Sequence, residues 1–376
     1  MIDSLDIVLI GVMIDKRYLE EILGIDDYTR FIDNEGKTGY SFTYKTVNFK
    51  YYSYRNLVVK TTTHKILDKK DITLFDREEY KSRLRKIIDE VIHQERYDKS
   101  LLVQIDYCAD INVGEYLEEY VKVMNKHSSR YKQKRRRRVY ETSIQISSVS
   151  GKLIKGYGKV ACIKDKAEEE RDDIILNYKN LDIRNQKLRE LEERTKKEIA
   201  LYKDVIRLEI SIRKSNLKYY YKESIKKLLK AKKLGKSKEE IDSIKIEYRT
   251  IDNYWNKESM CKQFFKEIKQ YYYTGDYYKL SIAVTKIKES DKYTNIMKDK
   301  LILFICRIKC VGIDKVKRIG LYSKGTIRNY IKMLSDLGIN PITIDEDSKY
   351  DMLESLYTLA IKQAKENYFD KKWFHI

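Results

Sequence analysis

The order of hydrophobic and polar residues differs between the two halves of the chain. In the first 160 residues, short β-branched and aromatic runs bounded by turn residues predict strands. These runs are Leu5–Met13, Ser41–Val47, Leu57–Thr63, Leu101–Asp110, Val139–Val149 and Lys152–Ile163. Apolar residues at helical spacing predict helices over Arg77–Tyr97 and Val113–His127. The mixture indicates an α+β fold built on an antiparallel sheet.

The second half is dominated by helical patterns. Residues 166–203 form a highly charged predicted helical arm, Asp204–Arg213 is a predicted strand, and residues 218–289 form a helical extension with a break at Gly235. A smaller helical module begins near residue 290. We therefore divide the chain into a catalytic domain, 1–289, with helical insertions, and a C-terminal module, 290–376.

The net charge of the chain indicates which kind of molecule the protein binds. The 376 residues include 78 Lys and Arg against 58 Asp and Glu, which gives a formal net charge of +20. So large an excess of cations is typical of proteins that bind a polyanion such as nucleic acid. No apolar run is long enough to span a membrane, and the five cysteines include no C-x-x-C pair. We expect a protein of the bacterial cytoplasm, without a disulfide framework or structural zinc.

Three predicted strands carry polar residues on one face only. Because side chains alternate along a strand, these faces can be read from the sequence. They present Asp106, Tyr157, Lys159, Arg207 and Glu209. If the strands are neighbours, the carboxylates could hold Mg²⁺ or Mn²⁺, and a tyrosine hydroxyl activated by the metal or by adjacent cations could attack a phosphodiester. A solvated sheet face is the alternative interpretation.

A basic run precedes the last two of the predicted N-terminal strands. Its cationic members are Lys132, Lys134, Arg135, Arg136, Arg137 and Arg138. We expect these residues to contact DNA phosphates, which would position the protein without reading sequence. A solvated basic loop is the alternative.

The C-terminal module contains a predicted helix-turn-helix. A short helix over Ile313–Ile319, a turn at Gly320 and a second helix over Lys324–Leu337 with Ser323 as its N-cap carry this prediction. Side chains of the second helix that could enter a major groove are Lys324, Thr326, Arg328, Asn329 and Lys332. Two-helix units of this shape also occur in ordinary cores.

Taken in order, several segments resemble the filamentous-phage replication initiators, the gene II/X family, which are similar to the rolling-circle initiators of plasmids. The resemblance rests on the opening Met1–Leu5, on LVQID at 102–106, on ETSIQISSVSGKLIKGYGK at 141–159, on IRLEISIRKSNLK at 206–218, on Trp255 with Phe264 and Phe265, and on TIRNYIKMLSDLGI at 326–339. Gln104 stands where the family has arginine, and Cys162 where it often has an acid.

The resemblance implies an enzyme that initiates rolling-circle replication. It would bind the origin as double- and single-stranded DNA and nick one strand through Tyr157. The products would be a 5′-phosphotyrosine and a free 3′-OH primer, and the strand would later be rejoined. Asp106 and Glu209 would bind Mg²⁺ or Mn²⁺, with Lys159 and Arg207 close to the phosphate. The family also implies a host helicase and polymerase as partners.

One alternative stays open. A rival register places the tyrosine motif on residues 162–166, which include no tyrosine. The chain would then be a non-catalytic, sequence-specific origin or operator binder that uses the same basic surface and C-terminal module. Metal-dependent DNA cleavage distinguishes the two hypotheses.

Overall fold

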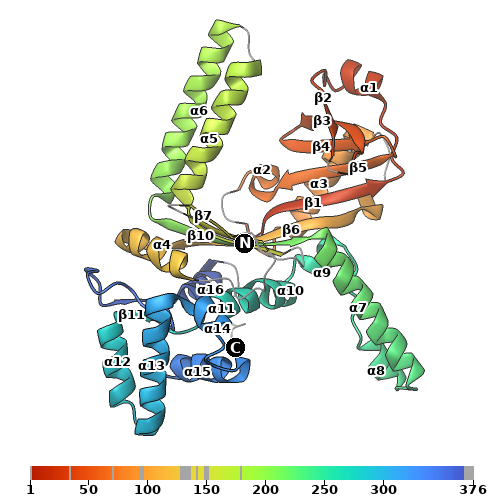
Figure 1. The fold of residues 1–376 in the computed structure, drawn as a ribbon. Coiled ribbons are helices and arrows are strands. Elements are labelled where there is room, and N and C mark those ends of the chain that lie inside the picture. Colours follow the sequence, from red (N-terminus) through yellow and green to blue (C-terminus); the bar gives the residue numbers. More distant parts are fainter. Residues whose placement is uncertain are drawn as a thin grey trace.

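The computed structural model describes residues 2–33, 35–69, 72–92, 97–127, 137–140, 143–147, 152–177 and 180–367. Ten strands of these residues form one antiparallel sheet in the order β2-β3-β4-β5-β1-β6-β10-β9-β8-β7 (Figure 1). Their bounds are β1 Ile2–Ile10, β2 Thr29–Ile32, β3 Thr38–Tyr44, β4 Val47–Tyr52, β5 Asn56–Thr62, β6 Leu101–Asn112, β7 Arg137–Tyr140, β8 Ser143–Ser147, β9 Lys152–Gly158 and β10 Val205–Arg213. A short ladder pairs β11, Tyr277–Tyr278, with β12, Met352–Leu353.

Helices cover one face of this sheet and project beyond it (Figure 1). Their bounds are α1 Lys16–Glu21, α2 Thr63–Leu67, α3 Arg77–Ile92, α4 Leu117–Lys126, α5 Lys159–Asn177, α6 Leu181–Tyr202, α7 Lys214–Lys233, α8 Lys238–Asp242, α9 Ile251–Tyr254, α10 Lys257–Met260, α11 Lys266–Tyr272, α12 Leu280–Glu289, α13 Asn295–Val311, α14 Ile313–Arg318, α15 Lys324–Asp336 and α16 Leu356–Asn367. Single 3₁₀ turns lie at Tyr97–Lys99 and Gly114–Tyr116, and a π-helical turn lies at Cys261–Phe265. The predicted α+β class with an antiparallel sheet is confirmed.

Three predicted strands have different ends in the structure. The run Ser41–Val47 is divided by a two-residue turn at Lys45 and Thr46, both with positive φ, which joins β3 to β4 as a tight hairpin. The run 139–149 is likewise divided, into the paired strands β7 and β8. The strand predicted to reach Ile163 stops at Gly158, and α5 begins at Lys159.

Two helical arms leave the sheet in different directions (Figure 1). The predicted charged arm is the hairpin of α5 and α6, which pack against each other, and Asn180 caps the start of α6. The second arm is formed by α7 and α8. The predicted break between them is confirmed: Gly235 has a φ of +65°, and Ser237 starts α8 with a capping box.

One face of the central strands forms the main core. Alternate residues of β10 are fully buried, namely Ile206, Leu208, Ile210 and Ile212. Each such side chain contributes roughly 1.5–3 kcal/mol to stability through burial. Helix α3 lies against this face, and the hydroxyl of its residue Tyr80 forms a hydrogen bond with the hydroxyl of Thr61 in β5. Because side chains alternate, the intervening residues of β10 must point to the opposite face.

Two glycines of β9 offer a matched test of this packing. A Cβ on Gly156 would overlap Tyr272 Oη and lie 2.9 Å from Met124 Sδ, whereas one on Gly158 would meet Leu117 at 3.8 Å, an ordinary contact. We expect Gly156→Ala to lower the free energy of unfolding by about 1–3 kcal/mol, and Gly158→Ala to change it little. Urea denaturation checks this, and equal effects would show that the helices do not press on β9.

The C-terminal residues form the predicted pair of helices. Helix α14 ends at Arg318 and Gly320 has a φ of +74°. Ser323 Oγ accepts a hydrogen bond from the backbone N–H of Thr326 at 3.0 Å, which caps α15 as predicted. Helix α12 packs against α13, so residues 280–289 contact the C-terminal module. The domain boundary near residue 290 stays a prediction. No helix within the described ranges has the length and apolar character needed to cross a membrane.

Candidate functional site

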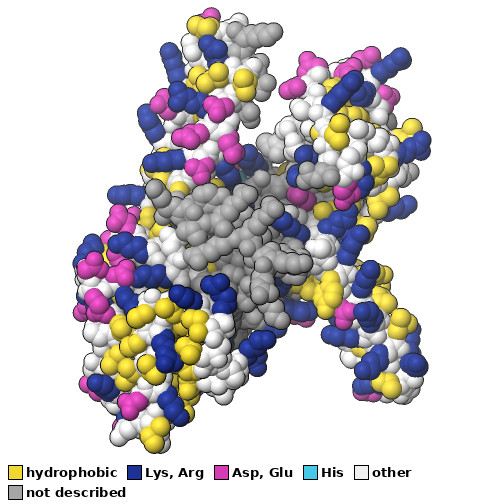
Figure 2. Space-filling view, in the orientation of Figure 1, with side chains coloured by type: hydrophobic (Ala, Val, Ile, Leu, Met, Phe, Trp, Pro, Cys, Tyr) yellow, Lys and Arg dark blue, Asp and Glu magenta, His cyan; other side chains and the backbone are white. Residues whose placement is uncertain are grey.

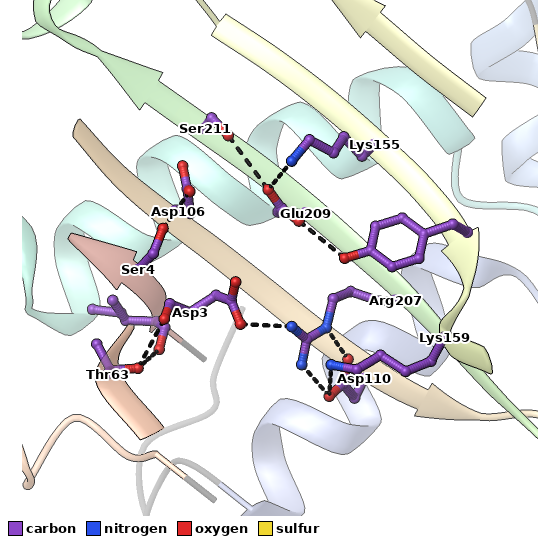
Figure 3. A network of polar contacts seen from close by, with 12 residues as sticks. Asp3, Ser4, Thr63, Asp106, Asp110, Lys155, Lys159, Arg207, Glu209 and Ser211 are labelled. Carbon is purple, nitrogen blue, oxygen red and sulfur yellow. Dashed lines mark hydrogen bonds and ion pairs between the residues drawn. The ribbon is translucent and has the colours of Figure 1, made fainter. Parts of the chain in front are cut away.

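The polar faces predicted on three strands meet at the centre of the sheet. Strand β10 lies between β6 and β9, so the prediction that these strands are neighbours is confirmed. The register places Arg207 between Tyr157 of β9 and Asp110 of β6. Two residues further along β10, Glu209 lies opposite Lys155. Figure 3 shows the resulting network of side chains on the face that the main core leaves free.

Glu209 is the centre of one half of the network. The residue is 3% exposed, and its carboxylate accepts hydrogen bonds from Lys155 Nζ at 2.6 Å and from Tyr157 Oη at 3.2 Å. Tyr157 is 9% exposed. Burial, with the negative charge of Glu209, raises the pKa of Tyr157 well above its ordinary value. Tyr157 is therefore a protonated hydroxyl whose proton already points at a carboxylate.

Asp106 supplies a second buried carboxylate beside Glu209. It accepts hydrogen bonds from Ser4 Oγ at 2.5 Å and from Gln104 Nε2 at 3.1 Å. Burial and the charge of Glu209 together raise the pKa of Asp106. The two carboxylates thus repel each other, and hydroxyl and amide donors only partly compensate for that repulsion.

This pair of carboxylates fits a divalent cation that is shared with a substrate. Nowhere in the described part of the chain do three or more His, Cys, Asp or Glu side chains gather as a metal site. Mg²⁺ is nevertheless often held by one or two carboxylates, with waters and substrate phosphate as its other ligands. Repulsion between Asp106 and Glu209 is the condition that such a cation would relieve.

Arg207 is the centre of the other half of the network. Its guanidinium forms a two-pronged ion pair with Asp110, with both N–O distances at 2.5 Å, and a further bond to Asp3 at 2.6 Å. Burial acts to raise the pKa of Asp3, but the charges of Arg207 and Lys159 hold it at about 2. Lys159 Nζ lies 3.6 Å from Asp110, and burial and the charge of Arg207 lower the pKa of Lys159.

The structure brings together all five residues predicted as catalytic or metal-binding. These are Asp106, Tyr157, Lys159, Arg207 and Glu209. The positions of some of these residues agree with their predicted roles better than others. Tyr157 and Glu209 are in direct contact, whereas three donors of Arg207 are already engaged by carboxylates. The geometry therefore favours a positioning role for Arg207 rather than direct contact with a phosphate.

Sequence reasoning left three members of the network without a role. Asp110 and Lys155 lie on strand faces that the alternation had identified, and a search for opposite charges on neighbouring strands would have paired them with Arg207 and Glu209. Asp3 carried no such signal. It reaches Arg207 because β1 pairs with β6 and because an irregularity interrupts that ladder between Ile2 and Ser4.

Only some of the residues predicted to contact DNA belong to the part of the chain that the structure describes. Arg137 and Arg138 belong to β7, whereas Lys132, Lys134, Arg135 and Arg136 fall outside the described residues. On α15 the apolar residues share one side of the helix, where Ile327 and Leu334 are buried and Tyr330 and Ile331 are half-buried. Of the predicted groove residues of α15, Lys324, Arg328, Asn329 and Lys332 are exposed and Thr326 is half-buried. Their contact with DNA stays a prediction.

Asp6 lies at the border of the network, in a shallow depression of about 390 Å³ that also includes Ser4 and Lys60. Burial raises the pKa of Asp6 to about 6, because it outweighs the opposing attraction of Lys60, 4.0 Å away, and the charge of Asp106 adds to the rise. The folded protein therefore holds the ionised form of Asp6 at a cost in stability.

This cost predicts a pH-dependent effect of Asp6→Asn. The folded pKa of about 6 exceeds the ordinary value of 3.8, so the native protein loses stability as the pH rises from about 4 through 6. The variant should be more stable than the native protein at pH 8, by up to about 2–3 kcal/mol, and should match it near pH 4. Urea denaturation across this range measures the difference. A difference that is constant with pH would show that Asp6 does not titrate as described.

Comparison with known proteins adds no assignment. The sequence matches no model of a known protein family and no curated protein. The functional argument therefore starts from the site.

Proposed function

We propose that this protein initiates rolling-circle DNA replication by nicking one strand with Tyr157 and later rejoining it. The observation that carries the proposal is the hydrogen bond from Tyr157 Oη to Glu209 at 3.2 Å, on a sheet face that also holds Asp106 and the cations Lys155 and Lys159. A nucleophile, a proton acceptor, a metal-binding carboxylate pair and cations for a phosphate are the parts that phosphodiester transfer needs.

The proposed reaction exchanges one phosphodiester for another. Tyr157 Oη forms a bond to the phosphorus, and the bond from phosphorus to the 3′ oxygen of the DNA breaks. The tyrosine is then joined to the 5′ phosphate, and the 3′ oxygen takes up a proton to become the primer hydroxyl. Glu209 accepts the tyrosine proton. Because the pKa of Tyr157 is raised, that proton leaves as the bond to phosphorus forms rather than in advance.

The remaining residues support this exchange electrostatically. Asp106 and Glu209 would hold Mg²⁺ or Mn²⁺, which would neutralise charge that develops on the phosphate oxygens. Lys159 has a longer ion pair than Arg207, 3.6 Å against 2.5 Å to Asp110, and so turns more easily toward a phosphate. Arg207 positions Asp3 and Asp110 around it.

The wider features of the chain support DNA as the substrate. The net charge is +20, and α15 presents a polar, partly cationic side to solvent as the second helix of a helix-turn-helix would. The resemblance to the gene II/X initiators supports an origin as the target, a host helicase and polymerase as partners, and the bacterial cytoplasm as the location.

A nicking assay tests the proposal. Supercoiled DNA of the encoding replicon is incubated with the protein and Mg²⁺ or Mn²⁺, and relaxed circles and covalent protein–DNA adducts are measured after denaturation. Protease digestion and mass spectrometry of the adduct should identify the peptide that contains Tyr157. Nicking without an adduct would indicate hydrolysis and would refute the tyrosine mechanism.

A non-catalytic origin or operator binder is the second candidate. It is favoured by the burial of Tyr157, only 9% of which is exposed, beside the well-exposed polar side of α15. Specific binding of the same DNA with no nick under any metal condition would support this candidate. Absence of any DNA binding would refute both.

A further inference from the structure

The two helical arms differ sharply in charge. Helices α5 and α6 together carry ten basic and eleven acidic residues, whereas α7 and α8 together carry nine lysines and four acidic residues. The bias lies in α7, which has eight lysines and one acidic residue, Glu223. Figure 2 shows the same contrast, because dark-blue side chains dominate the arm of α7 and α8 while magenta and dark blue alternate on the other arm. A merely solvated arm needs no such bias, since the α5–α6 hairpin is exposed with balanced charges.

The lysines of α7 occupy its solvent side. Leu217, Ser224 and Ala231 are buried at seven-residue spacing and mark the opposite side. The side that faces solvent carries four exposed lysines, Lys218, Lys222, Lys230 and Lys233. Their spacings of four, eight and three residues place them in one stripe along the helix. Within the described residues these four have no ion-pair partner, whereas Lys226 pairs with Glu223 at 2.8 Å. Burial and the nearby charges of Lys218 and Arg249 also lower the pKa of Lys214.

The arm follows the strand that carries part of the candidate site, and it packs on the core side of the sheet, where Tyr220 lies against Lys152. Strand β10 carries Arg207 and Glu209 and ends at Arg213, and α7 begins at the next residue. At 1.5 Å per residue the 20 residues of α7 extend about 30 Å. One turn of duplex DNA is about 34 Å long. The length of α7 therefore matches most of one turn of a duplex.

We propose that α7 binds the phosphate backbone of a DNA duplex through the stripe formed by Lys218, Lys222, Lys230 and Lys233. The inference rests on the proposed function for the identity of the polyanion. A rigid, straight row of unpaired cations matches a duplex, which is itself rigid and regularly charged. The contact would add affinity and orientation without reading sequence.

Four Lys→Gln substitutions in the full-length protein, at Lys218, Lys222, Lys230 and Lys233, test the proposal. Glutamine keeps helix propensity and removes the charge. The matched control replaces four exposed cations of the other arm, Arg171, Arg189, Lys196 and Lys197, by Gln. Affinity for a fluorescent 30-base-pair duplex of arbitrary sequence is measured by anisotropy over a range of KCl concentrations.

We expect the α7 variant to bind weakly, with a plot of log affinity against log salt that is less steep by about 0.9 for each lost phosphate contact, up to about 3.6 for four. The control should keep the native slope. Equal losses in both variants, or an unchanged slope in the α7 variant, would overturn the proposal. Loss of binding to phosphatidylserine vesicles with duplex binding intact would also overturn it, in favour of a membrane contact.

The outcome is separable from the nicking assay. Nicking by the native protein together with an unchanged α7 slope removes this inference and leaves the proposed function. A reduced α7 slope in a protein that never nicks supports the duplex contact and removes the enzymatic function.

Discussion

Replacement of Tyr157 by phenylalanine should abolish strand nicking and the covalent adduct while DNA binding is retained. The phenyl ring fills the same space, and the variant loses only the oxygen that would attack phosphorus and its hydrogen bond to Glu209. Loss of that one hydrogen bond costs about 1 kcal/mol, so the variant should fold. Loss of the nucleophile should slow conversion of supercoiled to open-circular DNA at least about thousandfold.

A neighbouring tyrosine provides the control. The ring of Tyr202, at the end of α6, lies beneath Lys159, with 4.7 Å between Nζ and the ring centroid. Tyr202→Phe keeps that ring and should nick at close to the native rate. Nicking and an adduct that persist in Tyr157→Phe would place the nucleophile elsewhere in the chain and contradict the assignment. Origin-binding measurements on both variants separate a chemical defect from a binding defect.

The polar face of the site could be predicted from the sequence because it depends on local geometry. Alternation along β6 and β10 is enforced by the strand backbone itself, so Asp106 and Glu209 had to lie opposite the apolar core residues of their own strands. The order of strands has no local signature. A long segment that includes the α5–α6 arm separates β6 from β10 in the sequence, yet the two strands pair directly.

Some ends of strands were predicted wrongly because they, too, have no signal in the local sequence. Lys159 shares the face of Tyr157 by alternation, but the chain turns into α5 at that residue, and nothing in the apolar pattern of residues 152–163 marks the change. Lys159 still reaches Asp110, because α5 begins at the edge of the site. The turn at Lys45 and Thr46 was missed because positive φ at residues other than glycine and asparagine is uncommon.

Replacement of Arg207 by alanine should destabilise the protein by about 3–5 kcal/mol. Arg207 is the shared partner of Asp3 and Asp110, and its removal leaves two largely buried carboxylates without their main counter-charge. The exposed ion pair of Arg194 with Glu170, at 2.6 Å, is the control, and Arg194→Ala should cost less than about 1 kcal/mol. Urea denaturation at pH 7 measures both.

The sign of the pH dependence makes the Arg207 prediction specific. With Arg207 present, the pKa of Asp3 is about 2, below its ordinary value of 3.8, so the stability from this contact is complete above pH 4 and is lost only as the pH falls through 2. Without Arg207, burial raises the pKa of both Asp3 and Asp110, and protonation of these groups in acid removes the repulsion between their two negative charges. The deficit of Arg207→Ala should therefore shrink between pH 7 and pH 4, and the triple variant that adds Asp3→Asn and Asp110→Asn should recover stability at pH 7. A deficit independent of pH, with no recovery in the triple variant, would mean that Arg207 stabilises the sheet by packing rather than by pairing its charge.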